Sequence, residues 1–275
     1  MKRSFLLAAG LAVVARPGLA DRIEPAQLAR LTPADVVILG EVHDNPRHHE
    51  NQALAVAGLR PAALVFEMLT PEKAALVTPD LRPSERSLAA VLDWDRSGWP
   101  DFAMYHPILL AAPEAQVFGA EVPRDEARAA VSEGAAAAFG AEAARFGLDR
   151  PLAPADLDRR IEEQRVAHCG ALPPDLLPGM VEAQRLRDAA LARAVMEAME
   201  ETGGPVAVIT GTGHARRDVG VPALLAEAAP ALRVLSIGQF EAPPEGDVPF
   251  DLWLVTAPAP RPDPCESLAG GGGAG

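Results

Sequence analysis

Residues 36–49 read VVILGEVHDNPRHH, and this stretch contains the transition that organises the fold. It opens with four consecutive apolar residues at 36–39, a pattern typical of a strand that is covered on both faces. Asn45 and Pro46 follow, and these residue types favour the N-cap and the first position of a helix. The stretch therefore predicts a strand, a short turn and a helix, with ionisable side chains gathered where the strand ends.

Further apolar runs repeat this pattern along the chain. They occupy residues 63–66, 116–119, 205–210, 232–237 and 252–256. Between them lie segments rich in Ala, Glu and Arg with helical spacing, including residues 125–146, 154–167 and 178–201. Apolar strands that alternate with helices predict an α/β fold, with a mostly parallel central sheet and helices on both faces.

The two ends of the chain differ in composition from the region between them. Residues 1–20 combine a basic start, a short apolar stretch and the sequence Gly18-Leu19-Ala20, which indicates a signal peptide and a periplasmic destination. There is no cysteine near residue 20 to which a lipid anchor could be attached. We expect no transmembrane segment after cleavage of the signal peptide. Residues 21–257 are expected to form one domain with a helical insertion at about 123–202, and the glycine-rich tail 258–275 is expected to be disordered.

Charge and cysteine content narrow the classes of partner. The net charge of −13 argues against nucleic acid, because binding phosphates requires clustered Lys and Arg. The chain has two cysteines, Cys169 and Cys265, and an oxidising compartment would permit a disulfide between them. The sequence alone leaves open whether they pair, because it does not show that their Cα atoms lie close enough.

The polar residues that follow the apolar runs are the first candidates for a site, because ligands of open α/β sheets bind beyond the carboxyl ends of the strands. Glu41 and His43 follow the first run, and their spacing of two places them on one side of an extended chain. Glu67 follows the second run, where a carboxylate is costly unless it is paired or ligating. His214 follows the fourth run, in the turn TGTGHARRD at 210–218, which matches neither a Walker loop nor a dinucleotide fingerprint. These four side chains form the predicted crevice.

Plainer interpretations remain open for several of these groups. Glu41, Asp44 and Asn45 could simply cap the helix, with His48 and His49 solvated in its first turn. The stretch WDRSGWPDFAMYHP at 94–107 holds two of the three Trp residues and the only Tyr, Tyr105. Its aromatic density predicts either a flat apolar ligand surface or a local hydrophobic cluster.

A further group lies on the long helical segment. Met180, Gln184, Arg187 and Asp188 share one helical face, which is typical of a polar network between helices. The adjacent pair His168-Cys169 precedes this segment, and adjacency alone is weak evidence for thiol catalysis.

Taken together, these motifs resemble the haem-binding uptake family of ChaN, within the superfamily of Tiki, TraB and erythromycin-esterase-like proteins. The resemblance covers most of the chain after residue 20. It rests on ILGEVHDNPRHH at 38–49, WDRSGWPDFAMYHP at 94–107, HCGALP at 168–173, MVEAQRLRDAALA at 180–192 and GTGHAR at 211–216. Glu121 departs from the family pattern, which has asparagine at that position.

The resemblance implies an α/β protein that binds haem or a related tetrapyrrole in the cell envelope and contributes to haem and iron uptake. It also implies a possible homodimer with cofacial haems and a tyrosine ligand assisted by histidine. Tyr105, the only tyrosine, is then the predicted ligand of the haem iron, with His106 or His168 as the second contact. His43 and His214 are further candidates for binding the cofactor.

The competing class is a metal-dependent hydrolase, which the superfamily's Glu and His residues suggest. Glu41, His43, Glu67 and His214 would then be catalytic and would ligate a divalent metal such as Zn²⁺ or Mn²⁺, or activate water. The sequence contains neither HExxH nor GxSxG, so an ordinary zincin or a serine hydrolase of the α/β-hydrolase type is not indicated. A third interpretation is a periplasmic scaffold whose ancestral site is idle.

Overall fold

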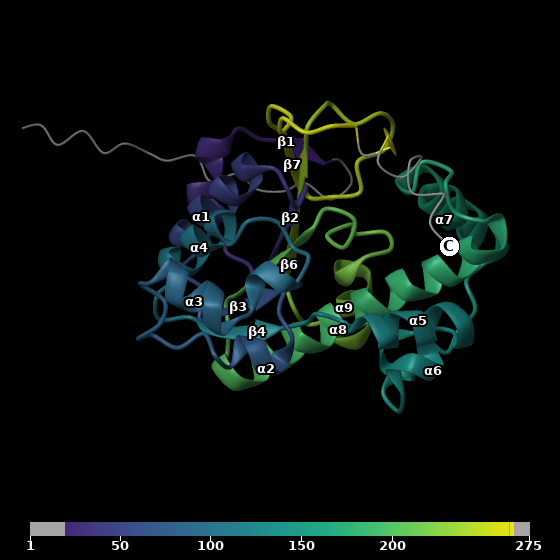
Figure 1. Ribbon diagram of the computed structural model, residues 1–275, viewed down its shortest axis with the longest axis horizontal. Coiled ribbons are helices and arrows are strands. Elements are labelled where there is room, and N and C mark those ends of the chain that lie inside the picture. The colour runs from purple at the N-terminus through teal and green to yellow at the C-terminus, as the bar shows by residue number, and fades with distance from the viewer. Residues whose placement is uncertain (1–19, 264, 267–275) are drawn as a thin grey trace, which may run out of the picture.

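A computed structural model describes residues 20–263 and 265–266 of the protein. The predicted signal peptide therefore lies outside the described residues except for Ala20, as do residues 267–275 of the tail. The described chain forms three layers, with a central sheet between two sets of helices (Figure 1). This architecture confirms the predicted α/β fold class.

The sheet has seven strands within the described residues, and every pairing in it is parallel. Its strands are β1 (Asp21–Arg22), β2 (Val36–Glu41), β3 (Ala63–Phe66), β4 (Gln116–Gly119), β5 (Val206–Gly211), β6 (Val234–Phe240) and β7 (Leu252–Val255). Their order across the sheet is β1-β7-β6-β2-β5-β3-β4. All six predicted runs form strands, and β1 is a short edge strand that the sequence pattern did not indicate.

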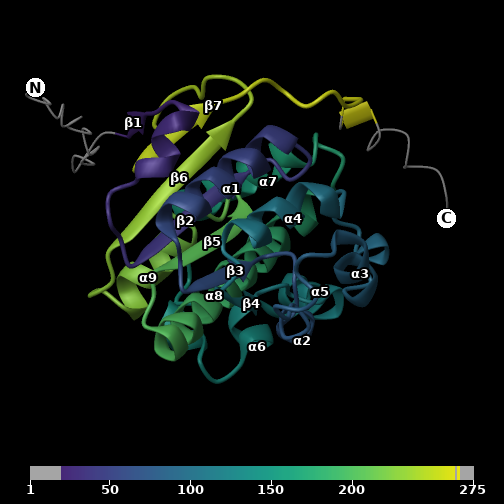
Figure 2. The same ribbon diagram turned by 90° about the vertical axis from the view of Figure 1, so that its left-hand side faces the viewer.

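Helices cover both faces of the sheet. One face carries η1 (Pro25–Arg30), α1 (Pro46–Leu59), α2 (Pro71–Ala74), α3 (Glu85–Val91), η2 (Trp94–Arg96) and α4 (Phe102–Ala111). The other carries α5 (Arg124–Glu133), α6 (Ala135–Phe139), η3 (Ala143–Phe146), α7 (Pro154–Ala167), η4 (Pro174–Leu176), α8 (Leu177–Thr202) and α9 (Val221–Ala228). Figure 1 shows α1, α3 and α4 on one side of the sheet and α5, α7 and α8 on the other, and Figure 2 shows α1 and α4 in front of the strands.

Alternation along the strands explains the two cores. Successive side chains of a strand point to opposite faces, so Val37 and Leu39 of β2 enter the core beneath α1 while Val36 and Ile38 enter the core beneath α8. Both sets are fully buried, which is why the run reads as continuously apolar rather than alternating.

The helical segment predicted at 123–202 is the connection from β4 to β5. Its last helix, α8, packs across β3, β4 and β5, while α5, α6 and α7 pack on α8. The helix expected at 125–146 is divided into α5, α6 and η3, because Gly134 adopts a φ of +91° and ends α5. This conformation is easily reached only by glycine.

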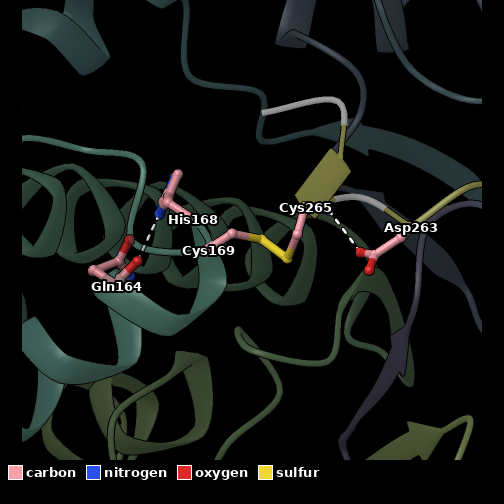
Figure 3. Close-up of a disulfide and its surroundings, with 5 residues drawn as sticks. All are labelled: Gln164, His168, Cys169, Asp263 and Cys265. Atoms are coloured by element: carbon pink, nitrogen blue, oxygen red, sulfur yellow. Dashed lines mark hydrogen bonds between the residues drawn. A yellow bond between two sulfur atoms is a disulfide. The ribbon is translucent and has the colours of Figure 1, made fainter. Parts of the chain in front are cut away.

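The described part of the tail is attached to the domain. The Ala259 N–H donates a hydrogen bond to Glu241, and Arg261 forms ion pairs with Glu241 and Asp44. Polar side chains therefore connect residues 259 and 261 to the domain, while residues 264 and 267–275 of the expected disordered tail lie outside the described residues. Cys169 and Cys265 form a disulfide across a Cα–Cα distance of 5.4 Å (Figure 3).

No helix in residues 20–263 and 265–266 is both long enough and apolar enough to cross a bilayer.

Candidate functional site

Three adjacent strands, β2, β5 and β3, bring the predicted crevice residues together at their carboxyl ends. Glu41 ends β2 and lies in register with Gly211, which ends β5. Glu67 directly follows β3, and its N–H donates to the Ile209 carbonyl of β5 at 3.1 Å. The two carboxylates therefore flank the end of β5. A Cβ atom on Gly211 would lie 2.9 Å from His43 Nε2, so glycine is required for the imidazole to reach between them.

Glu41 is the centre of the first half of the site, although only 2% of its surface is exposed. Its Oε1 lies 2.8 Å from His43 Nδ1 and accepts a hydrogen bond from the Tyr105 hydroxyl at 3.1 Å. Its Oε2 lies 3.4 Å from His49 Nδ1, and neither atom has a hydrogen-bond partner in the described part of the chain. The opposite nitrogen of His49 lies 2.8 Å from the His43 carbonyl, which can only accept, so the proton of the neutral ring sits on Nε2.

Glu67 is the centre of the second half, and its surroundings are more completely paired. Oε2 accepts hydrogen bonds from the Thr210 hydroxyl at 2.6 Å and from the Gly211 N–H at 2.8 Å. Oε1 lies 3.5 Å from His214 Nε2 and 3.9 Å from His43 Nε2. Burial acts to raise the pKa of Glu67, but the two imidazoles and the hydrogen bonds outweigh burial and hold the pKa well below its usual value.

His214 lies between two buried carboxylates. Its Nδ1 is 2.6 Å from Asp188 Oδ1 on α8, and the amide of Gln184 lies 3.2 Å from the ring. Burial disfavours the imidazolium, but Glu67 and Asp188 overcome this effect and raise the pKa of His214 to about 10. The pKa of Asp188 is raised because burial outweighs the attraction of His214. At neutral pH, His214 is therefore a buried cation held by two acids.

His43 joins the two halves and is the most exposed of these groups, with 32% of its side chain accessible. Burial lowers its pKa, but the hydrogen bond that His43 donates to Glu41 and the charges of Glu67 and Glu41 give a net increase. Its ring centroid lies 5.0 Å from that of Trp99, whose Nε1–H donates to Glu121 at 3.4 Å. His43 is thus an imidazole with one nitrogen fixed and an aromatic neighbour.

A cavity of about 210 Å³ lies beside Trp99 and Glu67, which both contact or approach His43. Its lining includes Glu67, Trp99, Glu121, Arg124, Arg187 and Leu191. Within the described residues, no ion pair or hydrogen bond occupies the guanidinium of either Arg124 or Arg187. The cavity therefore has an aromatic wall and two arginines that form no ion pair with any described residue.

Tyr105 is close to the site, but its hydroxyl is buried and is not accessible to a haem iron. Only 1% of its surface is exposed, and its ring packs between His49 at 4.3 Å and Trp94 at 5.1 Å. Burial and the charge of Glu41 both raise its pKa and oppose the phenolate. The interpretation of Tyr105 as the haem-iron ligand does not fit this conformation, because α4 turns the hydroxyl inward onto Glu41.

His106 and His168 do not reach the crevice. His106 follows Tyr105 on α4, and this position turns it toward the Arg82 carbonyl, 2.7 Å from Nε2. His168 ends α7, where its Nδ1 lies 2.8 Å from the Gln164 carbonyl. Both rings therefore bond to backbone carbonyls away from His43. Of the five residues predicted to bind the cofactor, the structure brings together His43, His214 and Tyr105.

The first turn of α1 also differs from the plainer interpretation. Asn45 caps the helix by accepting from the Arg47 N–H, as its residue type indicated. His48 and His49 are buried rather than solvated. His48 Nδ1 accepts from the Val42 N–H, and burial lowers the pKa of His48 to about 4.

Sequence reasoning understated the roles of His49, Asp188 and Trp99. Asp188 and Gln184 were recognised only as members of a polar helical face, and their pairing with His214 depends on how α8 crosses the sheet. For Trp99 the aromatic density was a usable signal. The other aromatic residues of that stretch, Trp94, Phe102 and Tyr105, belong to the core.

The four residues predicted for a metal-dependent hydrolase, Glu41, His43, Glu67 and His214, do lie close together. Their carboxylates and imidazoles pair with one another. Across residues 20–263 and 265–266, no set of three or more His, Cys, Asp or Glu side chains is arranged to hold a metal ion. An iron porphyrin makes a different demand, because a protein can hold its iron through a single side chain. His43 fits that demand, since a ligating imidazole usually donates its other N–H to a carboxylate, and Glu41 occupies that position.

Comparison with known proteins agrees with this architecture. The model of the family "Haem-binding uptake, Tiki superfamily, ChaN" matches residues 27–225. Among solved structures, "Cofacial heme binding to ChaN of Campylobacter jejuni" superposes with a TM-score of 0.58 at 19% identity, over 75% of this chain and 81% of that one. No curated protein matches the chain.

Two further structures resemble the fold more distantly. The type III effector HopBA1 has a TM-score of 0.41 at 14% identity, over 85% of this chain and 92% of that one. A mutant of the erythromycin esterase EreC has a TM-score of 0.37 at 14% identity, over 75% and 70%. The family match spans well over half of the sequence, and the chain belongs to the haem-binding uptake family of ChaN in the Tiki superfamily.

Proposed function

We propose that this protein binds an iron porphyrin beside Trp99, that His43 holds the iron, and that the protein contributes to haem uptake in the periplasm. The observation that carries the proposal is the environment of His43. It is a partly exposed imidazole whose Nδ1 is bonded to a buried carboxylate, and it lies next to an indole.

The pair of Glu41 and His43 suits ligation of haem iron. A buried carboxylate that accepts from Nδ1 fixes the tautomer, so the lone pair of the neutral ring is on Nε2. The same hydrogen bond makes the imidazole a better electron donor. Bound haem would supply the iron and its ligand chemistry, while this chain supplies the oriented imidazole and its surroundings.

The neighbouring cavity suits the edge of a porphyrin. Trp99 offers a flat apolar wall, and Leu191 adds apolar surface. Arg124 and Arg187 can pair with the two propionates, because guanidinium and carboxylate groups match in geometry. The two arginines would let a protein of negative net charge bind the two negatively charged propionates of the porphyrin.

The size of the cavity favours a second copy of the chain as a cover. Its volume of about 210 Å³ is below the range of roughly 300–1,000 Å³ typical of pockets that enclose small ligands. One porphyrin face would therefore stay outside this protomer. The C. jejuni ChaN structure is described as binding haem cofacially, and a similar homodimer would cover that face here.

A hemin titration of residues 21–275, followed by absorbance, tests the proposal. We expect a saturable Soret change for the wild type and a loss of affinity of more than ~10-fold for His43→Ala, since even the partners of ligating histidines are typically worth that much. His168→Ala is the matched control, because it removes a part-buried histidine outside the site and should bind hemin like the wild type. Circular dichroism would verify that both variants fold. Equal affinity in His43→Ala would refute His43 as the ligand.

The proposed location and dimer need separate measurements. Fractionation of cells that express the full chain should recover it, shortened at its N-terminus, in the periplasmic fraction. Analytical ultracentrifugation with hemin should show a dimer whose formation depends on the ligand. Recovery from the cytoplasm would refute the location, and a monomer saturated with hemin would refute the dimer.

A further inference from the structure

A second cavity, of about 320 Å³, lies on the other side of His214 from the porphyrin cavity. Its polar lining includes Arg160, Gln164, His168, Gln184, Asp188 and Arg216. It lies between α7, the first half of α8 and the loop after β5. The two cavities share no lining residue, so this one requires its own explanation.

Arg160 is the feature that points to a ligand. Its Nε atom is buried and has no hydrogen-bond partner in the described part of the chain, and no ion pair or hydrogen bond engages its side chain there. Arg160 is partly buried, and burying a guanidinium nitrogen without a hydrogen-bond partner is costly. An anionic group in the cavity would supply the missing partners.

The acidic groups around Arg160 are already engaged by other cations. Glu163 pairs with Arg159 and Arg216, and Asp218 pairs with the same two arginines. Asp188 is bonded to the buried imidazolium of His214. Arg160 is consequently the one arginine lining this cavity that forms no ion pair or hydrogen bond within the described residues.

The remaining lining narrows the class of ligand. Ala167, Val181 and Val219 provide apolar surface for a short hydrocarbon body. Glu163 and Asp188 would repel a second negative charge, which disfavours a phosphate dianion. The planar guanidinium matches a carboxylate through two parallel hydrogen bonds.

The wall opposite α8 is held in place by the disulfide. Figure 3 shows Gln164 and His168 at the end of α7, directly beside the Cys169–Cys265 bond. The His168 ring is bonded to the Gln164 carbonyl at 2.8 Å, so both lining residues belong to one fixed corner. The cavity is thus bounded by cross-linked structure.

From these observations we infer that the cavity between α7 and α8 is a binding site for a small monocarboxylate with an apolar body, anchored by Arg160. This site is separate from the proposed porphyrin site and goes beyond that function. Its occupant would lie next to Asp188 and Gln184, two of the residues that contact His214.

Isothermal titration calorimetry of residues 21–275 with phenylacetate tests the inference. We expect saturable binding, no comparable binding of the neutral analogue phenylacetamide, and weaker binding of inorganic phosphate. Arg160→Gln should weaken phenylacetate binding by about 10-fold or more, the effect of losing a hydrogen bond to a charged group.

Arg159→Gln is the matched control, because the neighbouring side chain is directed to Asp156, Glu163 and Asp218 instead. It should bind phenylacetate with nearly the wild-type affinity, and Arg160→Gln should bind hemin normally. The inference is overturned if the folded wild type shows no saturable phenylacetate binding, or if Arg160→Gln binds as well as Arg159→Gln. Tighter binding of phosphate would overturn the assigned class.

Discussion

Glu41 and Glu67 lie at the same edge of the sheet, on either side of β5, yet their surroundings differ. Glu67 has hydrogen-bond donors on one oxygen and the imidazolium of His214 facing the other. Glu41 has donors on one oxygen, while its other oxygen is buried without a hydrogen-bond partner in the described chain. Both oxygens of Glu67 therefore have hydrogen-bond or ion-pair partners, whereas one oxygen of Glu41 has no hydrogen-bond partner among the described residues.

The contrast separates structure from function within one crevice. A buried polar network in which every group has a partner holds the fold in a single arrangement. A buried acceptor left without a partner signals a group whose bonding changes with a ligand or proton. We therefore propose that the Glu67 half contributes mainly to stability and that the Glu41 half, through His43, contributes mainly to ligand binding.

The largest expected effect is on stability when the completed network is broken. His214→Ala leaves Glu67 and Asp188 buried without their shared cation and should lower the free energy of unfolding by roughly 3–5 kcal/mol. Urea denaturation measures this change. His168→Ala, which removes a part-buried histidine elsewhere, should cost much less. Equal losses in the two variants would contradict the contrast.

The same network predicts a dependence of stability on pH. Because folding raises the pKa of His214 from 6.5 to about 10, its contribution is complete below pH 6.5 and is lost as the pH rises toward 10. The free energy of unfolding should fall between pH 7 and 9 by up to about 1.4 kcal/mol per pH unit from this group. Urea titrations at pH 7, 8 and 9 measure the slope. A His214→Ala variant with the same slope would show that another group is responsible.

A smaller effect is expected in the Glu41 half. Tyr105→Phe removes one hydrogen bond to a carboxylate that retains His43, and should lower the free energy of unfolding by about 1–2 kcal/mol. Ile108→Val, an apolar substitution on the same buried helix, provides a reference for packing changes alone. A loss as large as that of His214→Ala would place Tyr105 in the structural network.

The smallest effect is expected at the cavity wall. Trp99→Phe keeps an aromatic face but loses indole area and the bond to Glu121, so hemin affinity should fall by only about 2–5-fold, corresponding to 0.5–1 kcal/mol of aromatic contact. The hemin titration described above measures it. A complete loss of binding would mean that Trp99, and not His43, dominates the interaction.

Much of the fold and part of the site could be predicted from the sequence. The apolar runs identify the strands because both faces of a parallel sheet are buried. The convergence of Glu41, Glu67 and His214 follows from their positions after strands, since parallel strands end at one edge. The shared edge follows without knowledge of the strand order, while the contact among these side chains depends on β5 lying between β2 and β3.

The remaining features depend on long-range packing that local patterns do not encode. Tyr105 and His106 are adjacent on α4, and only the docking of that helix decides which one faces Glu41. The position of β5 between β2 and β3 likewise explains why Gly211, rather than Gly213, lies beneath His43. The pairing of Cys169 with Cys265 could not be predicted, because it depends on where the tail runs.

The most direct test of the account is a hemin titration of His43→Ala and Tyr105→Phe measured side by side, with folding of each verified. The account predicts that Tyr105→Phe keeps nearly the wild-type affinity and Soret spectrum while His43→Ala loses more than ~10-fold in affinity. Loss of binding in Tyr105→Phe together with retention in His43→Ala would contradict it and restore tyrosine as the ligand of the iron.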